Sequence, residues 1–185
     1  MNYIETEIPG VWIIEPKVFA DARGYSMEAW GKMDFDAHIK DVTFVQDNES
    51  CSSRGVLRGL HYQLNPYAQS KLVRVIKGCV LDVAVDIRKG SPTFGRYVAV
   101  ELSGENKRQL FIPQGFAHGF HVLSEEAIFT YKVDNPYAPS CERGIRFDDP
   151  TIGIDWRITD PHSLNLSEKD QKAPLLEAAE INFTY

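Results

Sequence analysis

Along the chain, short runs of β-branched and aromatic residues are separated by clusters of turn-forming residues. In the run at 80–87, apolar and polar character varies with a period of two, so Asp82 and Asp86 fall on one side and Val83 and Val85 on the other. Strands with an apolar face stack into a sandwich or barrel. The pattern therefore predicts an all-β protein. The eight predicted strands span residues 11–14, 43–46, 72–76, 80–87, 96–102, 108–112, 127–133 and 144–147.

Helix signals are confined to short segments near the two ends of the chain. Residues 33–39 are predicted to form one short helix, and Ser167, with the acidic Asp170 three positions on, is typical of the N-cap of a second. The pair Lys77 and Gly78 and the segment 89–92 indicate tight turns between strands. Because no repeat, linker or low-complexity segment is found, we expect residues 1–185 to form a single domain.

Composition narrows the range of partners. The chain has 185 residues and a formal net charge of −6, which argues against binding nucleic acid by neutralising many phosphates. Its three cysteines lack the spacing of a zinc site or a disulfide framework. The N-terminal residues do not form a signal peptide, and no apolar stretch is long enough to span a membrane. We therefore expect a cytoplasmic protein with neither nucleic acid nor membrane as a partner.

The segment 54–71 combines cationic groups with an otherwise apolar, strand-like pattern. Arg58, His61 and Lys71 fall within fourteen residues, and half-burying them without acidic partners is costly unless an anion binds there. In an extended chain His61 would share a face with Gln63, while Leu60 would point the other way. A titratable imidazole beside cations is typical of proton-transfer chemistry on an anionic substrate. A packed histidine or a solvated edge strand is the alternative.

The segment 113–120, PQGFAHGF, contains the spacing P-x-G-x-x-H and presents His118 at the start of a strand. This spacing resembles the second motif of the cupin superfamily, small barrels of jelly-roll type, whose metal-binding members carry an H-x-H in the first motif. Here that stretch reads His61, Tyr62, Gln63, with Lys71 downstream. An ammonium repels a divalent cation and glutamine is a poor metal ligand, so we expect no metal. A buried structural histidine remains the alternative for His118.

Two further polar residues have ordinary structural interpretations when each is taken alone. Tyr131 lies on the face of its predicted strand that carries Phe129 and Val133, as a core tyrosine would. Asp170 is suited to the first turn of a short helix because of the helix dipole. Only their combination with His61 gives them a chemical meaning.

Taken in order along nearly the whole chain, these segments closely resemble the dTDP-4-dehydrorhamnose 3,5-epimerase family, whose members act in dTDP-L-rhamnose synthesis, a branch of carbohydrate and polysaccharide biosynthesis. The resemblance implies a cupin-type jelly-roll fold, isomerase activity without a cofactor, and a dTDP-linked 4-keto-6-deoxy sugar as substrate. The segments that carry it are residues 19–28 (FADARGYSME), 45–48 (VQDN), 55–63 (GVLRGLHYQ), 71–75 (KLVRV), 91–95 (SPTFG), 105–123, 131–132 and 166–170 (LSEKD).

Carried over position by position, the resemblance implies that His61 is the catalytic base, that Asp170 orients and polarises it, that Tyr131 is the opposing acid, and that Lys71 lies near the sugar carbonyl. It also implies a set of residues that hold the substrate, several of them at the nucleotide end. This set comprises Arg23, Glu28, Gln46, Asp47, Asn48, Arg58, His118, Glu142 and Lys169, with Tyr137 a further candidate for stacking on the base.

The resemblance further implies a homodimer in which Arg23 and Glu28 complete the site of the neighbouring subunit. The chain departs from the family at Ser26, where a second aromatic residue is usual after Arg-Gly, and this bears on local pocket packing. Two other functions stay open. One is a 3-epimerase acting at a single centre of a related nucleotide-linked keto sugar, and the other is a non-catalytic cupin that binds a sugar nucleotide.

Overall fold

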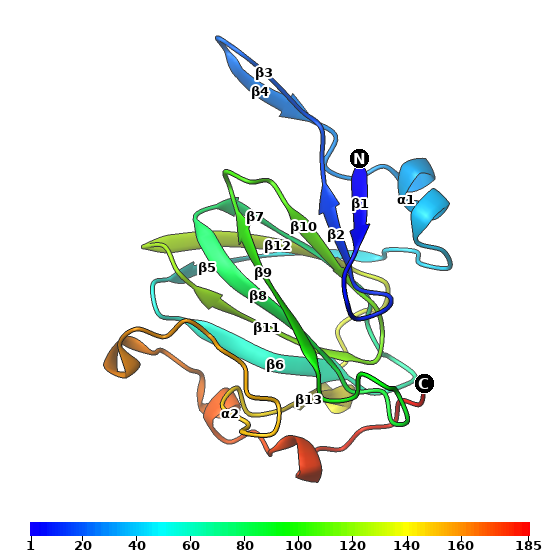
Figure 1. Cartoon of the computed structure of the whole chain (residues 1–185), viewed down its shortest axis with the longest axis vertical. Coiled ribbons are helices and arrows are strands. Elements are labelled where there is room, and N and C mark those ends of the chain that lie inside the picture. The colour runs from blue at the N-terminus through cyan, green and yellow to red at the C-terminus, as the bar shows by residue number, and fades with distance from the viewer.

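The computed structural model describes all 185 residues and contains two antiparallel sheets that face each other (Figure 1). The larger sheet has the strand order β1 (Asn2–Glu5), β2 (Trp12–Glu15), β10 (Gln109–Ile112), β7 (Lys71–Lys77), β12 (Glu126–Val133), β5 (Gln46–Ser53). The smaller sheet has the order β13 (Glu142–Gly144), β6 (Leu57–Gln63), β11 (Phe116–Val122), β8 (Cys79–Asp86), β9 (Tyr97–Ser103). The predicted all-β fold is thus confirmed.

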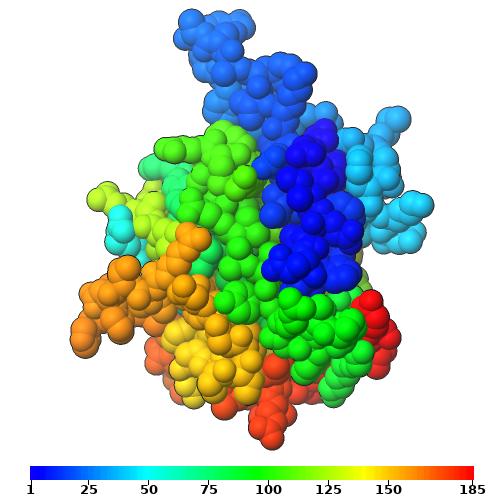
Figure 2. Space-filling view, viewed as in Figure 1, coloured from blue at the N-terminus to red at the C-terminus, as the bar shows by residue number.

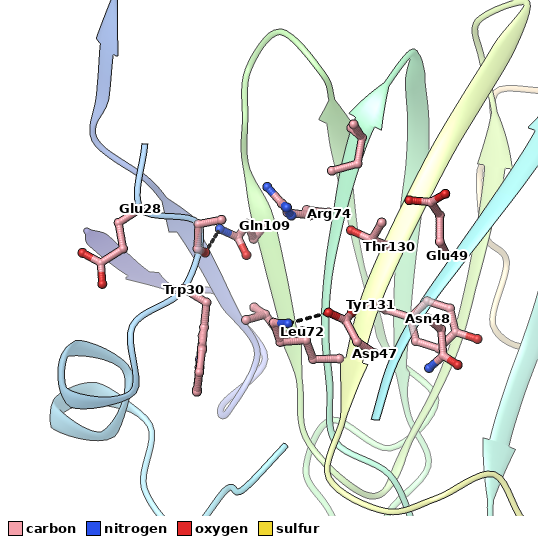
Figure 3. Close-up of a pocket in the computed structure, with 13 residues that line it drawn as sticks. Glu28, Trp30, Asp47, Asn48, Glu49, Leu72, Arg74, Gln109, Thr130 and Tyr131 are labelled. Atoms are coloured by element: carbon pink, nitrogen blue, oxygen red, sulfur yellow. Dashed lines mark hydrogen bonds and ion pairs between the residues drawn. The ribbon is translucent and has the colours of Figure 1, made fainter. Parts of the chain in front are cut away.

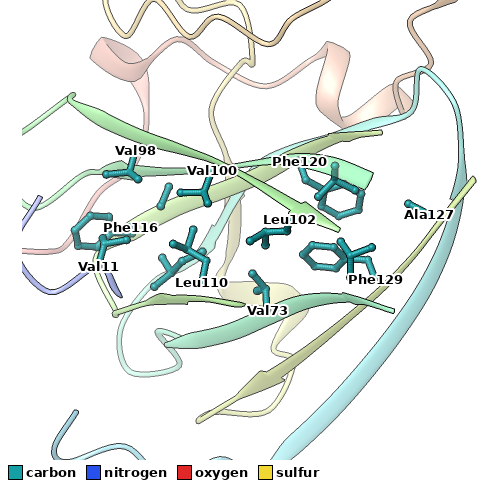
Figure 4. Packing of buried hydrophobic residues seen from close by; sticks show 14 of the residues in the cluster. Val11, Val73, Val98, Val100, Leu102, Leu110, Phe116, Phe120, Ala127 and Phe129 are labelled. Carbon is teal, nitrogen blue, oxygen red and sulfur yellow. The ribbon is translucent and has the colours of Figure 1, made fainter. Parts of the chain in front are cut away.

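The main core lies between the two sheets, where side chains from both inner faces interdigitate (Figure 4). Strand β8 packs apolar side chains on both faces of its sheet, whereas the sequence pattern predicts a strand with one apolar face. Val80 and Ala84 point into the core, whereas Leu81 and Val83 pack outward in a second cluster. As the alternation predicts, Asp82 shares the inner face with Val80 and Ala84, and it is completely buried.

Short helices and a long C-terminal segment cover the outer faces of the sheets. Helix α1 (Lys32–His38), close to its predicted bounds, buries Phe35 against Leu72 and Phe111 on the outer face of the larger sheet. The chain after β13 packs against the outer face of the smaller sheet and carries three of the remaining four short helices, while the other directly precedes β13. None of these helices has the length and apolar character needed to cross a membrane. They are η1 (Pro139–Cys141), η2 (Pro161–Ser163), α2 (Glu168–Gln171) and η3 (Leu176–Ala178).

Two of the eight predicted strands were wrong and three strands were missed, while β6 lies in the segment 54–71 and β11 begins in the segment 113–120, whose motifs indicated strands outside those eight ranges. Residues 43–45 lie outside any strand, and the strand begins only at Gln46. Of the predicted strand at 144–147, only Gly144 lies in β13. Strand β5 is polar on both sides because its inner side chains border a cavity, so its sequence lacks a hydrophobic signal. The missed strands are β1 and the hairpin formed by β3 (Val18–Asp21) and β4 (Gly24–Met27).

The β3–β4 hairpin extends away from the body of the molecule, at the top of Figures 1 and 2. All of β3 is exposed, including Phe19, which is 59% exposed. At the turn, Arg23 forms an ion pair with Asp21 at 2.6 Å. Ser26 pairs with Phe19 in the hairpin register and is itself exposed. Within this chain, Ser26 therefore packs against no pocket wall of the two-sheet body.

A bulge in β6 brings two cationic residues to the same side of the sheet. His61 pairs with His118 of β11 and Arg58 pairs with Phe120, so β6 has one residue more than its partner over this stretch. Gly59 in the bulge has φ +116°, and a Cβ placed there would lie 2.6 Å from the carbonyl oxygen of His118. Only glycine fits this close approach, and the bulge lets residues three positions apart face inward together.

Candidate active site

Most of the predicted site residues surround one cavity of ≈ 180 Å³ between the two sheets. The two sheets contribute opposite walls, and α2 contributes from the C-terminal segment. The lining contains cations, hydroxyls and two histidines above a floor of Phe120 and Phe129. Seven predicted residues line it together, namely Arg58, His61, Lys71, His118, Tyr131, Glu142 and Lys169, along with Ser50.

His61 on β6 is held by a carboxylate from the C-terminal segment. The distance from His61 Nε2 to Asp170 Oδ1 is 2.5 Å, and the Asp170 side chain is only 4% exposed. A carboxylate only accepts hydrogen bonds, so Nε2 carries the proton and Nδ1 has the free lone pair. Burial raises the pKa of Asp170, but hydrogen bonds from His61 and Ser167 outweigh it, so this pKa lies below its usual range.

The N-cap of α2 explains how such a short helix can fix Asp170. The Oγ atom of Ser167 accepts a hydrogen bond from the Asp170 backbone N–H and donates one to Asp170 Oδ2, at 2.8 Å. This is the N-cap predicted from the sequence. One carboxylate oxygen is thus bound by the cap, and the other remains for the imidazole.

Lys71 and Tyr131 reach the cavity from the larger sheet, on neighbouring strands β7 and β12. Neither the Lys71 ammonium nor the Tyr131 hydroxyl has a hydrogen-bond partner within the chain, and neither is sealed from solvent. Burial lowers the pKa of Lys71 from 10.5 to about 8, against the opposing effect of Asp82 and Glu142. Burial raises the pKa of the Tyr131 phenol, so it remains protonated at neutral pH.

His118 lies beside His61 on the smaller sheet and has a carboxylate partner that the sequence interpretation missed. Its Nε2 atom lies 3.1 and 2.9 Å from the two oxygens of Asp82. Burial lowers the pKa of His118 despite the opposing influence of this carboxylate. The strict alternation in residues 80–87 was the signal for Asp82, since it placed a carboxylate on the same face as core residues.

A second cavity of ≈ 300 Å³ adjoins the first, since Tyr131 lines both and Tyr137 of the second contacts Glu142 of the first. It is lined by Gln46, Asn48, Gln69, Tyr131 and Tyr137. At its border, Glu142 accepts hydrogen bonds from Tyr137 Oη at 2.8 Å and from Lys169 Nζ at 2.6 Å. Burial raises the pKa of Glu142, but these bonds bring it below its ordinary value.

Three predicted residues do not reach this site within the chain. Asp47 points to the outer face of the larger sheet and pairs with Lys132 at 2.7 Å, whereas Asn48 points inward (Figure 3). Adjacent residues of a strand face opposite ways, so the implied trio cannot share one wall through its side chains. Glu28 borders the same outer groove as Asp47, and Arg23 lies at the tip of the protruding hairpin.

The position that would carry the second histidine of a metal-binding cupin has another task here. Gln63 Nε2 donates to the carbonyl oxygens of Tyr67 and Pro136, and its Oε1 accepts from the Ala138 backbone N–H. All of these bonds fix surrounding loops. No three His, Cys, Asp or Glu side chains are arranged to hold a metal ion.

The fold and the site define a class: a cupin-type β-sandwich whose cavity holds acid–base residues. Comparison with known proteins makes the assignment specific. The sequence model of the dTDP-4-dehydrorhamnose 3,5-epimerase family matches residues 5–178. The chain belongs to this family.

Individual relatives agree with this assignment. The dTDP-4-dehydrorhamnose 3,5-epimerase of Shigella flexneri is 60% identical, over 92% of this chain and 93% of that protein. The crystal structure of a dTDP-6-deoxy-D-glucose-3,5-epimerase from Legionella pneumophila, in complex with dTDP-4-keto-L-rhamnose, has 50% identity and a TM-score of 0.92, with 96% and 93% of the chains covered. A 3'-monoepimerase from Streptomyces bikiniensis in complex with dTDP-quinovose has 35% identity, a TM-score of 0.87, and 94% and 87% coverage.

Proposed function

We propose that this protein catalyses the 3,5-epimerisation of dTDP-4-dehydro-6-deoxy-D-glucose to dTDP-4-dehydro-L-rhamnose, as its relatives' names describe. One observation carries the proposal: His61 and Tyr131 border a single cavity from opposite sheets. Epimerisation beside a ketone removes a proton from one face of the ring and returns one to the other. A single base cannot serve both faces, and this pair can.

In the proposed mechanism His61 is the base. Its unprotonated Nδ1 accepts the proton from the carbon beside the ketone, and the Asp170 carboxylate at Nε2 stabilises the imidazolium that forms. The burial of Asp170 and its bond to Ser167 keep this carboxylate in place during the transfer. The electron pair of the broken C–H bond moves into the enolate.

The enolate carries negative charge on the C4 oxygen, and Lys71 is the group we assign to it. A cation that meets this oxygen stabilises the transition state more than the neutral ketone. The Lys71 ammonium has no competing hydrogen-bond or ion-pair partner within the chain. The Tyr131 phenol then donates its proton to the opposite face of the same carbon. His61 releases its proton to solvent and the Tyr131 phenolate takes one up, and the same steps at the other centre then complete the double inversion.

The remaining groups suit the nucleotide and its diphosphate. Arg58 Nε donates to Ser52 Oγ, and no carboxylate pairs with its guanidinium. It therefore remains available for phosphate oxygens, which planar arginines bind well. Beyond it, Gln46 and Asn48 line the neighbouring cavity with Tyr137, and His118, Glu142 and Lys169 complete the walls. The side chain of Asp47 points away from the cavity, so Asp47 would contact the nucleotide through its backbone.

Incubation of the dTDP-linked 4-keto sugar with the protein in D₂O tests this function. We expect deuterium at both C3 and C5, with the L-configured product visible by NMR. Deuterium at C3 alone would instead assign a 3-epimerase, an alternative supported by the structural similarity to a 3'-monoepimerase. Tight dTDP binding without any exchange would indicate a binding protein and contradict the proposal.

We further propose that the active form is a homodimer in which the β3–β4 hairpin reaches the site of the second subunit. The hairpin extends away from its own body, which Tyr25 contacts through Lys107, and it exposes Phe19 and Tyr25. Its Arg23 side chain is 91% exposed, with only Asp21 as an ion-pair partner. In this arrangement Arg23 and Glu28 would contact the nucleotide bound to the partner, which accounts for their distance from the cavity of their own chain.

Mixed dimers test this arrangement. Arg23→Ala and His61→Asn variants, each inactive alone, are co-expressed with different affinity tags. If the hairpin acts in trans, each mixed dimer has one doubly altered site and one unaltered site. A random mixture then recovers about a quarter of the wild-type sites, as two-fold symmetry requires. Purified mixed dimers without activity, or an active monomer at all concentrations, would rule out the shared site.

A further inference from the structure

Asp82 is a buried carboxylate with a single side-chain partner. It lies on β8 facing the space between the sheets, with none of its surface exposed. Both of its oxygens contact Nε2 of His118, at 3.1 and 2.9 Å, and no other side chain donates to them. Burying a carboxylate costs several kcal/mol unless it is paired. The position is therefore expensive for the fold, and a packing role alone does not account for a charged group there.

The contact fixes the protonation pattern of His118. Since a carboxylate only accepts hydrogen bonds, the proton of the neutral imidazole must be on Nε2. The ring borders the cavity, and its Nδ1 atom has neither a partner within the chain nor complete burial. Nδ1 is consequently an acceptor that faces the cavity, suited to a hydroxyl group of the sugar and unsuited to its ketone oxygen.

Through His118, Asp82 is one side chain away from the cavity that Lys71 lines. Lys71 belongs to the same cavity and has no salt-bridge partner. We propose that Asp82 is a positioning residue of the active site, which holds His118 as a hydrogen-bond acceptor for a sugar hydroxyl. Because its buried negative charge contacts a residue that lines the same cavity as Lys71, it also favours the ammonium form of Lys71, the form assigned to the enolate oxygen. This inference rests on the proposed function for its substrate, but its structural part does not.

The charges around Lys71 determine the direction of the expected effect. Burial lowers the pKa of Lys71 to about 8, and Asp82 is the first of two anions that oppose this, the other being Glu142. Lys169 acts in the opposite sense. Removing the charge of Asp82 must therefore lower the pKa of Lys71 further. The groups that share the cavity from the elements around it are Arg58 and His61 (β6), His118 (β11), Tyr131 (β12), Glu142 (β13) and Lys169 (α2).

The variant Asp82→Asn tests the charge, since an amide oxygen can still accept from Nε2. We expect kcat/KM to fall by about 10- to 100-fold, the range found when residues that orient metal-bound histidines are altered. The loss of kcat/KM should be at least about threefold larger at pH 9 than at pH 7. The reason is that Lys71 deprotonates at lower pH in the variant, so the alkaline limb of the pH profile of kcat/KM moves to lower pH. Asp82→Glu should restore part of the limb. A folded Asp82→Asn protein with an unchanged limb would overturn the proposal.

Asp86→Asn is the matched control. Asp86 lies four residues further along β8 and its side chain is equally buried, but it pairs with Arg88 at 2.8 Å and lines neither part of the site. We expect this variant to lose stability without a shift in the alkaline limb. An equal shift in both variants would mean that the effect comes from general loosening of β8, which contradicts a specific role for Asp82.

Two NMR measurements need no substrate, and the first of them also needs no variant. Long-range ¹H–¹⁵N NMR should find the His118 proton on Nε2, and a proton on Nδ1 would overturn the proposal even if every variant failed to fold. An NMR titration of Lys71 in wild type and Asp82→Asn should show the lower pKa in the variant. If the keto sugar is not epimerised, the proposed function fails while these structural results stand, so the two failures are distinguishable.

Discussion

Replacing His61 with Asn is expected to lower kcat/KM for the keto sugar by roughly 10² to 10⁴-fold, the usual contribution of a well-placed general base. Deuterium from the solvent should no longer enter at C3 or C5, because in the proposed mechanism both exchanges begin with proton removal by the same imidazole. Asparagine can still donate to Asp170, so the buried carboxylate keeps a partner and the fold should survive. NMR of the sugar ring in D₂O measures both centres at once.

His121→Asn is the control for losing a histidine from this sandwich. His121 lies on β11, is nearly as buried as His118, and contacts the carbonyl oxygen of Trp156 through Nδ1, outside the cavity. The control is expected to cost stability and to leave the exchange rate per folded molecule unchanged. If His61→Asn exchanged both protons at the wild-type rate, His61 would not be the base.

The parts of the fold that the sequence predicts are those whose side chains alternate between apolar and polar or lie on two apolar faces. Strands β7 to β10 and β12 follow their predicted ranges within a few residues. Most of strand β5 was not predicted, because its inner side chains border the site and are polar. These side chains include Gln46, Asn48 and Ser50. A strand that serves chemistry loses the hydrophobic signal that would reveal it.

The candidate site was predictable where a motif and a local geometry coincide, as at Ser167 and Asp170, where an N-cap fixes the carboxylate. It was not predictable where the decisive contact is long-range. The contact between His61 and Asp170 joins residues 109 positions apart, and the pairing of His118 with Asp82 crosses 36. No local pattern encodes such distances.

Asp47 illustrates a different limit. Transfer of a family role to three consecutive residues ignores the pleat of a strand, which turns the middle side chain to the opposite face. Here that face is the outer groove with Trp30 and Lys132. The hairpin with Arg23 and Glu28 is a third case, because a single chain contains no partner to show what these residues contact. Arg23 lies far from the cavity of its own chain, so its implied role requires a second subunit, as in the proposed homodimer.

Replacing Tyr131 with Phe should separate proton removal from inversion. The variant keeps the ring that packs beside Phe129 and loses a hydroxyl that no group in the chain contacts, so the fold should be unaffected. In the proposed mechanism His61 still forms the enolate in this variant, but no acid faces the other side of the sugar ring. We expect formation of the inverted product to fall by about 10² to 10⁴-fold, while deuterium still enters recovered, uninverted substrate from the His61 side.

The comparison of two readouts makes this experiment decisive. Stereochemistry and deuterium content are measured in the same NMR sample, so a general loss of activity would reduce both, whereas loss of the opposing acid reduces only inversion. Tyr62→Phe is the matched control, because the Tyr62 hydroxyl donates to the carbonyl oxygen of Glu180 in the second hydrophobic cluster, away from the cavity. Tyr131 was assigned as the acid because burial keeps its phenol protonated and no second phenol lines the same cavity. Inverted product at the wild-type rate from Tyr131→Phe would therefore contradict this assignment and show that the returned proton comes from another group.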